Sequence, residues 1–507
     1  MLLPILSAIL GILAFPPLGV YPLGFIFLIP LFIFFIKENN LLKLLWGVFL
    51  FRIILGTGLF YFIFEPLVFI LSILVFLGLP LSFFLLRRFI RKIKPTIAST
   101  QSEVACLLIA LPFLWVFWDF FEAKYSFLPT FLMTAGNIFG SSPFLGLAAI
   151  GGLIGLAFFT AAINCLISFL ILNFRKSELK ISAISVLFII FVISGGYSIS
   201  KSEFQKNTSI YQTFPNKLKI ALISSANNFD QEFNFFKHNV LSPEEKIIAE
   251  TLMEKKTNLI KNELGGEKID LMILPEDLIS IESWQDIDIE AKNKFGIENS
   301  GVLIGAYRKL ALELNTNLAA TLTTVQDNKR YNSTILFNRR GELADIYNKF
   351  NLTIVGEYWP FGDWRPFYYK FIKNDLLEAG QGRAIFNKEY AYQRGQEKTL
   401  QVENLVFGSA ICSEIQYPWQ IKKLKKMGAK FISHTATNRW ATLGLKNLRE
   451  LTNNLRKIEA VWLQTPILIN GREEMAGIIT PDGKMDLVNF ENDHKNFGIF
   501  IGEVKTN

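Results

Sequence analysis

The sequence predicts two domains of different kinds, a helical membrane domain followed by a layered α/β domain. The composition is 51% hydrophobic with a mean hydropathy of +0.32, which is too apolar for an ordinary soluble chain of 507 residues. Most of the 48 Phe residues and the long apolar runs lie in the first 200 positions. After position 217, short β-rich runs alternate with amphipathic helical patterns. We therefore assign residues 1–200 to a transmembrane domain, 201–216 to a linker and 217–507 to a globular domain.

The first domain is predicted to hold about seven spans, because a span needs roughly 17–25 apolar residues. They are expected at residues 2–15, 23–36, 44–64, 67–86, 104–121, 144–172 and 181–194. The first two are short, and the sixth is expected to tilt or break at Gly151 and Gly152. The N-terminus lacks a charged region and a small-residue cleavage site, so no removed signal peptide is expected.

Basic residues mark every second loop of this domain. They are Lys37 and Lys43, then Arg87, Arg88, Arg91, Lys92 and Lys94, then Arg175, Lys176 and Lys180. The positive-inside rule places these loops in the cytoplasm and, with an odd number of spans, the globular domain outside it. The net charge of +8 is then largely a topology signal, and nucleic acid is not an expected partner. Asp119 and Glu122 are expected at the outer interface.

The globular domain is predicted to be an α/β fold. Strands are expected at 219–226, 270–276, 318–324, 331–338, 342–347, 399–402, 405–412, 430–434, 466–469 and 475–479, with helices at 243–263 and 414–429. Residues 301–314 form part of a third strand–helix unit.

Cys412 is the one cysteine of this domain, since Cys106 and Cys165 fall in apolar segments of the first. It ends a strand directly before a helix, where backbone amides and the helix dipole favour a thiolate nucleophile. A buried thiol that only fills space is the alternative.

Two other charged residues also end strands, Glu276 after DLMILP and Lys349 after the 342–347 strand. Strand ends of an α/β domain converge on one edge, so the three side chains can meet. A carboxylate can take the thiol proton and a lysine can stabilise an oxyanion, which makes a complete acyl-transfer set. Each residue alone could instead be a turn or surface charge.

The motifs PE, NK and ICSE, which contain Glu276, Lys349 and Cys412, follow one another along the chain. This order resembles that of the nitrilase superfamily, whose members use Glu, Lys and Cys on an αββα sandwich. The segments 11–32 and 143–164 resemble spans of bacterial apolipoprotein N-acyltransferases, and 331–361, with its GEY-x-PF motif, is similar to their hairpin and lysine loop. Residues 454–460 and 479–484 also match.

The resemblance implies that Cys412 takes an acyl chain from a phospholipid as a thioester and passes it to the N-terminal amine of a diacylglyceryl-modified apolipoprotein. It assigns Glu276 as the base and Lys349 to the oxyanion. Supporting residues are Glu357, Tyr358, Glu414 and Trp440. No cofactor or metal is expected. The implied protein is a monomer in the bacterial inner membrane, with its catalytic domain on the periplasmic face.

The chain departs from the family pattern at several positions. Ser413 replaces a tyrosine, Leu274 a tryptophan and Asn438 an aspartate, and residues 472–474 differ too. Residues 498–507 are too short and too charged for the family's C-terminal span. Two other readings stay open, a membrane-anchored amidohydrolase and a non-catalytic lipid-binding homologue. The aromatic segment 358–392 is predicted either to dip into the membrane or to cover the domain core.

Overall fold

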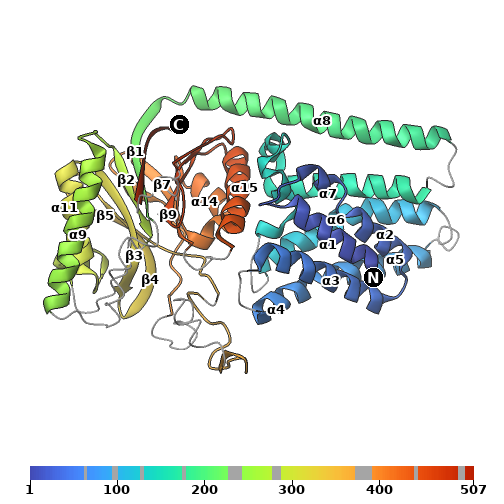
Figure 1. Ribbon diagram of the computed structural model, residues 1–507, viewed down its shortest axis with the longest axis horizontal. Coiled ribbons are helices and arrows are strands. Elements are labelled where there is room, and N and C mark those ends of the chain that lie inside the picture. Colours follow the sequence, from blue (N-terminus) through green and yellow to red (C-terminus); the bar gives the residue numbers. More distant parts are fainter. Residues whose placement is uncertain are drawn as a thin grey trace. The chain divides into compact units, whose positions relative to one another are not determined.

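The computed structural model divides the chain into two compact units, shown in Figure 1. One comprises Met1–Ser209 and Leu443–Gln464, and the other Ile210–Thr442 and Thr465–Asn507. The structure describes residues 1–61, 66–93, 101–125, 131–173, 179–225, 243–276, 287–354, 356–370, 391–438, 444–488 and 497–506.

The regular structure in the described residues of the first unit is helical, with short turns between the helices. Its α-helices are α1 (Leu2–Ala14), α2 (Ile29–Lys37), α3 (Leu41–Phe60), α4 (Pro66–Phe76), α5 (Gly78–Ile93), α6 (Gln101–Tyr125), α7 (Ala148–Asn173), α8 (Leu179–Gln212) and α15 (Leu445–Leu463). Within the described residues, five helical segments are long and apolar enough to cross a membrane, and two shorter apolar ones occupy the first two predicted spans. The predicted break in the sixth span is confirmed, because Gly152 has φ +59° and ψ −150° inside α7.

The expected 201–216 linker is largely helical instead. α8 continues from the membrane segment to Gln212, and β1 begins at Asn216. One of the polar residues that suggested a linker, Asn207, has partners at the end of α15. Asn207 is buried, donates to the Val461 carbonyl at 3.4 Å and accepts from the Gln464 amide at 3.1 Å. Because these partners come from a distant part of the chain, composition alone could not reveal that the helix continues.

Asp119 and Glu122 were expected at an interface, and the structure buries both. Arg52, from the middle of α3, forms ion pairs with both carboxylates, at 3.6 Å to Asp119. Its guanidinium lies 3.9 Å from the centre of the Phe76 ring. The sequence signal was a single arginine inside an apolar run, which needs carboxylate partners when it is buried.

The second unit is built on a single mixed sheet, and this confirms the predicted α/β domain. Its path is β5 (Leu343–Asn348), β4 (Lys329–Phe337), β3 (Asn317–Gln326), β2 (Leu271–Glu276), β1 (Asn216–Ser225), β9 (Ile467–Arg472), β8 (Ile432–Thr437), β7 (Leu405–Ile411) and β6 (Leu400–Val402). The neighbours from β3 to β7 along this path run parallel. β10 (Ala476–Ile479) pairs with β9 and with β11 (Met485–Val488).

The sheet folds over, so that its two ends face one another. Thr334 on β4 shares a 2.8 Å hydrogen bond with Ser409 on β7. An inner core fills the space between the halves, and it includes Ile273, Tyr347, Phe407 and Leu468. An outer core joins β1–β4 to α9 (Pro243–Leu264) and α11 (Gly301–Leu314), which lie side by side in Figure 1. Apolar layers on both faces explain why β2 and β9 are buried along their whole length.

The end of the chain supplies a strand that was not predicted. β12 (Phe497–Thr506) pairs antiparallel with β1 over ten residues, from Asn216–Thr506 to Ser225–Phe497. These residues had been recognised only as too short and charged to span a membrane. Their apolar positions Phe500 and Val504 are buried in the inner core.

Candidate active site

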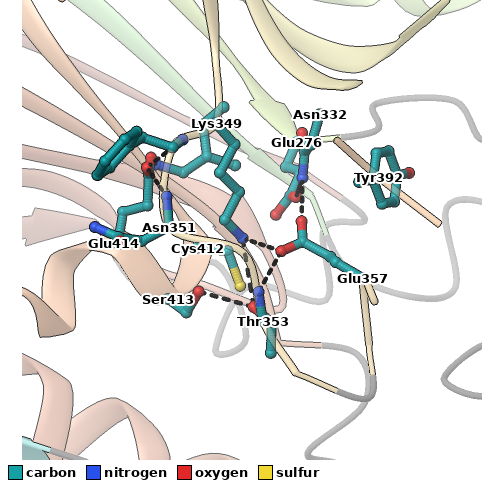
Figure 2. Close-up of polar contacts among 12 residues, drawn as sticks. Glu276, Asn332, Lys349, Asn351, Thr353, Glu357, Tyr392, Cys412, Ser413 and Glu414 are labelled. Atoms are coloured by element: carbon teal, nitrogen blue, oxygen red, sulfur yellow. Dashed lines mark hydrogen bonds and ion pairs between the residues drawn. The ribbon is translucent and has the colours of Figure 1, made fainter. Parts of the chain in front are cut away.

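Three strand ends bring the predicted catalytic residues together at one edge of the sheet. Glu276 is the last residue of β2, Lys349 follows β5 and Cys412 follows β7. Figure 2 shows their side chains pointing toward one another. The charges of Glu276 and Lys349 both act on the Cys412 thiol, which confirms that the three groups are close.

Glu276 is buried, and its two oxygens are fixed by different donors. The Asn332 side-chain amide donates to Oε1 at 2.8 Å, and the Thr437 backbone N–H donates to Oε2 at 2.8 Å. Pro275 precedes it and lacks an N–H, and the β2–β3 register shifts between Ile273 and Glu276. This irregularity ends the ladder where the carboxylate turns toward the site.

Lys349 is paired with Glu357, a residue of the GEY loop. Its Nζ lies 2.9 Å from Glu357 Oε2, and both side chains are buried. Asn332 also donates to Glu357 Oε1, at 3.1 Å, so one amide holds both carboxylates. Burial lowers the pKa of Lys349, but the charges of Glu357, Cys412 and Glu276 outweigh it and raise the pKa above its ordinary value. The amine is therefore a fixed positive charge.

Cys412 occupies a strained turn. It has φ +52°, in the left-handed region, and it opens the 3-10 helix η7 (Cys412–Gln416). His434 on the adjacent β8 donates from Nε2 to the Cys412 carbonyl at 2.8 Å, and the Ser413 backbone N–H donates to the thiol. These contacts hold the sulfur at the sheet edge.

The expectation that this position favours a thiolate is wrong. Burial, followed by the charge of Glu276, raises the pKa of Cys412 to about 12, and Lys349 offsets only part of the rise. η7 has only five residues, so its dipole is short. The resting thiol is therefore neutral and needs a base to lose its proton.

Glu414 anchors the loops around the site. It is fully buried and accepts hydrogen bonds from the Tyr347 hydroxyl, the Gln420 amide and the backbone N–H groups of Phe350, Asn351 and Ile411, at 2.7–3.0 Å. Burial raises its pKa above the ordinary value. With five donors, its oxygens tie the loop that follows Lys349 to the end of β7.

Ser413 belongs to a short polar chain that reaches the lysine. Its hydroxyl and that of Thr353 share a hydrogen bond of 2.8 Å. Thr353 Oγ1 lies 3.5 Å from Lys349 Nζ, and the Thr353 N–H donates to Glu357 Oε2 at 2.7 Å. The serine that departs from the family pattern therefore has a partner across the site.

The remaining expected residues are placed as follows. Tyr358 directly follows Glu357 and lines a cavity beside the site. Trp440 lies outside the described residues. Asn438 donates to Glu474 Oε2 at 3.0 Å, so two positions that depart from the family pattern pair with each other. Among the described side chains, no group of three His, Cys, Asp or Glu residues could hold a metal ion.

Sequence reasoning missed three residues that shape the site, Asn332, Thr353 and His434. All three act through contacts made across the sheet edge. Asn332 on β4 and His434 on β8 stand among other polar residues of their strands, so no local signal singles them out.

Comparison with known families agrees with this architecture. A family model described as carbon-nitrogen hydrolase matches residues 211–461, and one described as apolipoprotein N-acyltransferase N-terminal domain matches residues 7–166. The carbon-nitrogen hydrolase match spans the sheet edge that carries Glu276, Lys349 and Cys412, and it places the second unit in the nitrilase, or carbon-nitrogen hydrolase, superfamily. Both matches in one chain make it a member of the apolipoprotein N-acyltransferase family of that superfamily.

Individual relatives are distant. The apolipoprotein N-acyltransferase of Chlorobaculum tepidum is 22% identical over 341 residues, which cover 66% of this chain and 60% of the relative. That of Aquifex aeolicus is 24% identical over 158 residues, 31% of each chain. The structure of Saccharomyces cerevisiae Nit3, a nitrilase-superfamily member, is 16% identical with a TM-score of 0.37, covering 58% of this chain and 91% of that one. The chain thus spans about 60% of the length of the first relative.

Proposed function

We propose that the protein transfers an acyl chain from a phospholipid to the N-terminal amine of a diacylglyceryl-cysteine on an apolipoprotein. The observation that carries the proposal is the meeting of Glu276, Lys349 and Cys412 at one sheet edge, in a chain whose described residues include five candidate membrane spans. The match to the N-acyltransferase N-terminal domain supports a multi-pass membrane protein and this acceptor.

In the first step Glu276 takes the thiol proton as the Cys412 sulfur attacks the ester carbonyl of the donor. A base is required because the thiol is neutral at rest. Lys349 Nζ and the Ser413 N–H stabilise the negative charge that develops on the carbonyl oxygen. The tetrahedral intermediate then breaks its bond to the glycerol oxygen. Glu276 returns the proton to that oxygen, and a lysophospholipid leaves a thioester on Cys412.

In the second step the free α-amine of the acceptor attacks the thioester carbonyl. Glu276 receives a proton from the amine and passes it to the departing Cys412 sulfur. The amide forms and the neutral thiol is restored. The exchange of a thioester for an amide is downhill and changes no oxidation state, so the cycle needs neither an energy source nor a redox group. Glu357 keeps Lys349 in position through the 2.9 Å ion pair during both steps.

We also propose that the protein resides in the bacterial inner membrane with its catalytic unit on the periplasmic face. The alternating basic loops support this orientation. Both substrates carry lipid chains, and a catalytic unit joined to membrane spans can take them from the bilayer. An amidohydrolase with the same three residues would instead release the acyl chain to water.

A transfer assay tests the proposal and separates it from hydrolysis. The purified protein is incubated with phospholipid vesicles and a diacylglyceryl-cysteine peptide, and the mass of the peptide is then measured by mass spectrometry. We expect one added acyl group on the peptide. We expect none on a matched peptide with an acetylated N-terminus. Release of free fatty acid at equal rates with either peptide would support the hydrolase and contradict the transferase.

A further inference from the structure

A basic cavity lies next to the three catalytic residues. Its volume is about 470 Å³, within the range of about 300–1,000 Å³ typical of small-molecule sites. Tyr358, Trp359 and Tyr392 form aromatic walls, and Arg365 and Arg394 supply two positive charges. Among the described residues that line it, there is no Asp or Glu. A cavity with this lining favours an anionic group attached to an organic body.

Backbone hydrogen bonds fix one wall of the cavity to the catalytic residues. The Tyr392 N–H donates to the Glu357 carbonyl at 2.9 Å, and the Gly395 N–H donates to the Lys349 carbonyl at 2.8 Å. Figure 2 shows Tyr392 beside Glu357. Arg394 stands between these two attachment points, so its position relative to Lys349 is set by the fold.

Arg394 is the cationic group best suited to a ligand. Its guanidinium lies 5.2 Å from the centre of the Phe350 ring, and the ion pairs of the described residues do not include it. Arg365 already donates to the Gly362 and Trp364 carbonyls, at 2.6 and 2.8 Å, and so contributes mainly charge. Burial raises the pKa of Tyr358 and the charge of Arg394 lowers it, with a net rise, so its hydroxyl remains a donor at neutral pH.

We infer that this cavity binds the phosphate of the phospholipid donor, with Arg394 as the principal contact and Tyr358 as a second donor. The inference rests on the proposed function. A guanidinium can bind a phosphate through two parallel N–H···O bonds. In a phospholipid only a short glycerol linker separates the phosphate from the ester carbonyl. A phosphate held beside Arg394 therefore directs that carbonyl toward Cys412 and Lys349.

Binding of unreactive lipids tests the inference without requiring catalysis. The full-length protein in detergent is titrated calorimetrically with a short-chain diether glycerophosphoethanolamine and with the matching diether glycerol, which lacks the phosphate. We expect the phosphate-bearing lipid to bind about tenfold more tightly, as one charge-assisted contact allows. Arg394→Gln should abolish most of this preference, and Arg394→Lys should retain part of it.

Arg340→Gln is the matched control. Arg340 is exposed in the β4–β5 turn and pairs with Glu342 at 3.0 Å, so this variant should keep the full preference. An unchanged preference in Arg394→Gln, with native gel filtration, would overturn the inference. Inorganic phosphate that binds as tightly as the lipid, and that Arg394→Gln weakens equally, would show a free-phosphate site instead. If the protein prefers the phosphate-bearing lipid as expected but does not transfer an acyl chain, the result would contradict the proposed function and leave the phosphate site supported.

Discussion

The protonation state of Cys412 depends on Glu276, which cannot be seen from the sequence around the cysteine alone. The thiol has a pKa of about 12 because it is buried and because the Glu276 carboxylate is near. The same carboxylate that suppresses the resting thiolate is the group placed to accept the proton during attack. In the proposed mechanism, the thiolate therefore forms only as the sulfur attacks a substrate carbonyl.

This coupling predicts opposite effects of Glu276→Gln on two reactions. Below the pKa, the thiolate fraction rises about tenfold per pH unit, so alkylation of wild-type Cys412 by iodoacetamide should increase from pH 7 to 10 without a plateau. Removing the carboxylate lowers the thiol pKa, so the variant should be alkylated faster at pH 8. Its thioester formation should fall about a hundredfold or more because the base is lost. Slower alkylation in the variant would contradict this account.

Ser413 and Thr353 are predicted to position Lys349 through their hydroxyl pair. Thr353→Val keeps the shape but removes the hydroxyl, and should lower kcat for thioester formation about two- to tenfold, the worth of one hydrogen bond. KM should change little, because the pair contacts the lysine rather than the cavity. Thr353→Ser restores the hydroxyl and should recover most of the rate. Equal losses in both Thr353 variants would show that packing, not the hydrogen bond, matters.

The described part of the aromatic segment after Glu357 contains both buried and exposed side chains. Trp359 and Tyr369 are buried and cover the domain, whereas Trp364 and Phe367 are 55% and 79% exposed. Among the described aromatic residues of this segment, Trp364 and Phe367 are therefore the pair best placed to contact a lipid surface. The remainder of the predicted segment, residues 371–390, lies outside the described part of the chain.

Replacing Trp364 and Phe367 by Ser should therefore reduce turnover of phospholipid in vesicles several-fold more than turnover of a short-chain, water-soluble ester. Exposed aromatic side chains gain free energy by entering the interface, and a soluble donor does not need that contact. The two rates are compared in one preparation by mass spectrometry. Equal losses on both donors would contradict a membrane-contacting role.

In the helical unit, Arg52 is predicted to be essential for stability. Arg52→Leu leaves Asp119 and Glu122 buried without their cation, and removing one partner of a buried pair costs about 3–5 kcal/mol. The Tm of the detergent-solubilised protein should fall by several degrees. Adding Asp119→Asn and Glu122→Gln removes the stranded charges and should recover much of the loss. An unchanged Tm in Arg52→Leu would show that the carboxylates have other support.

At the scale of the whole molecule, the division into two kinds of domain was predictable from the sequence, because apolar spans and β-rich alternation are local patterns. Most strands and the strand-end positions of Glu276, Lys349 and Cys412 were predictable for the same reason. The parts that could not be predicted depend on distant partners. β12 forms by pairing with β1, and the end of α8 is held by hydrogen bonds to α15. Glu414 accepts hydrogen bonds from donors in three separate segments.

The thiol pKa shows the same limit. Local position before a helix favoured a thiolate, but the outcome is decided by burial and by Glu276, which lies far away in the sequence. A strand-end cysteine identifies a candidate nucleophile, whereas its protonation state follows from the assembled site. Family membership and the site geometry both support the proposed chemistry, although the relatives of the chain are only distantly similar.

The most direct test of the central claim is the intact mass of the purified protein after incubation with phospholipid in the absence of acceptor. We predict an added mass of one acyl chain, sensitive to hydroxylamine as a thioester is, and absent from Cys412→Ser. The same adduct on Cys412→Ser, or no adduct on the wild-type protein under conditions that support lipoprotein N-acylation, would contradict a Cys412 acyl-enzyme.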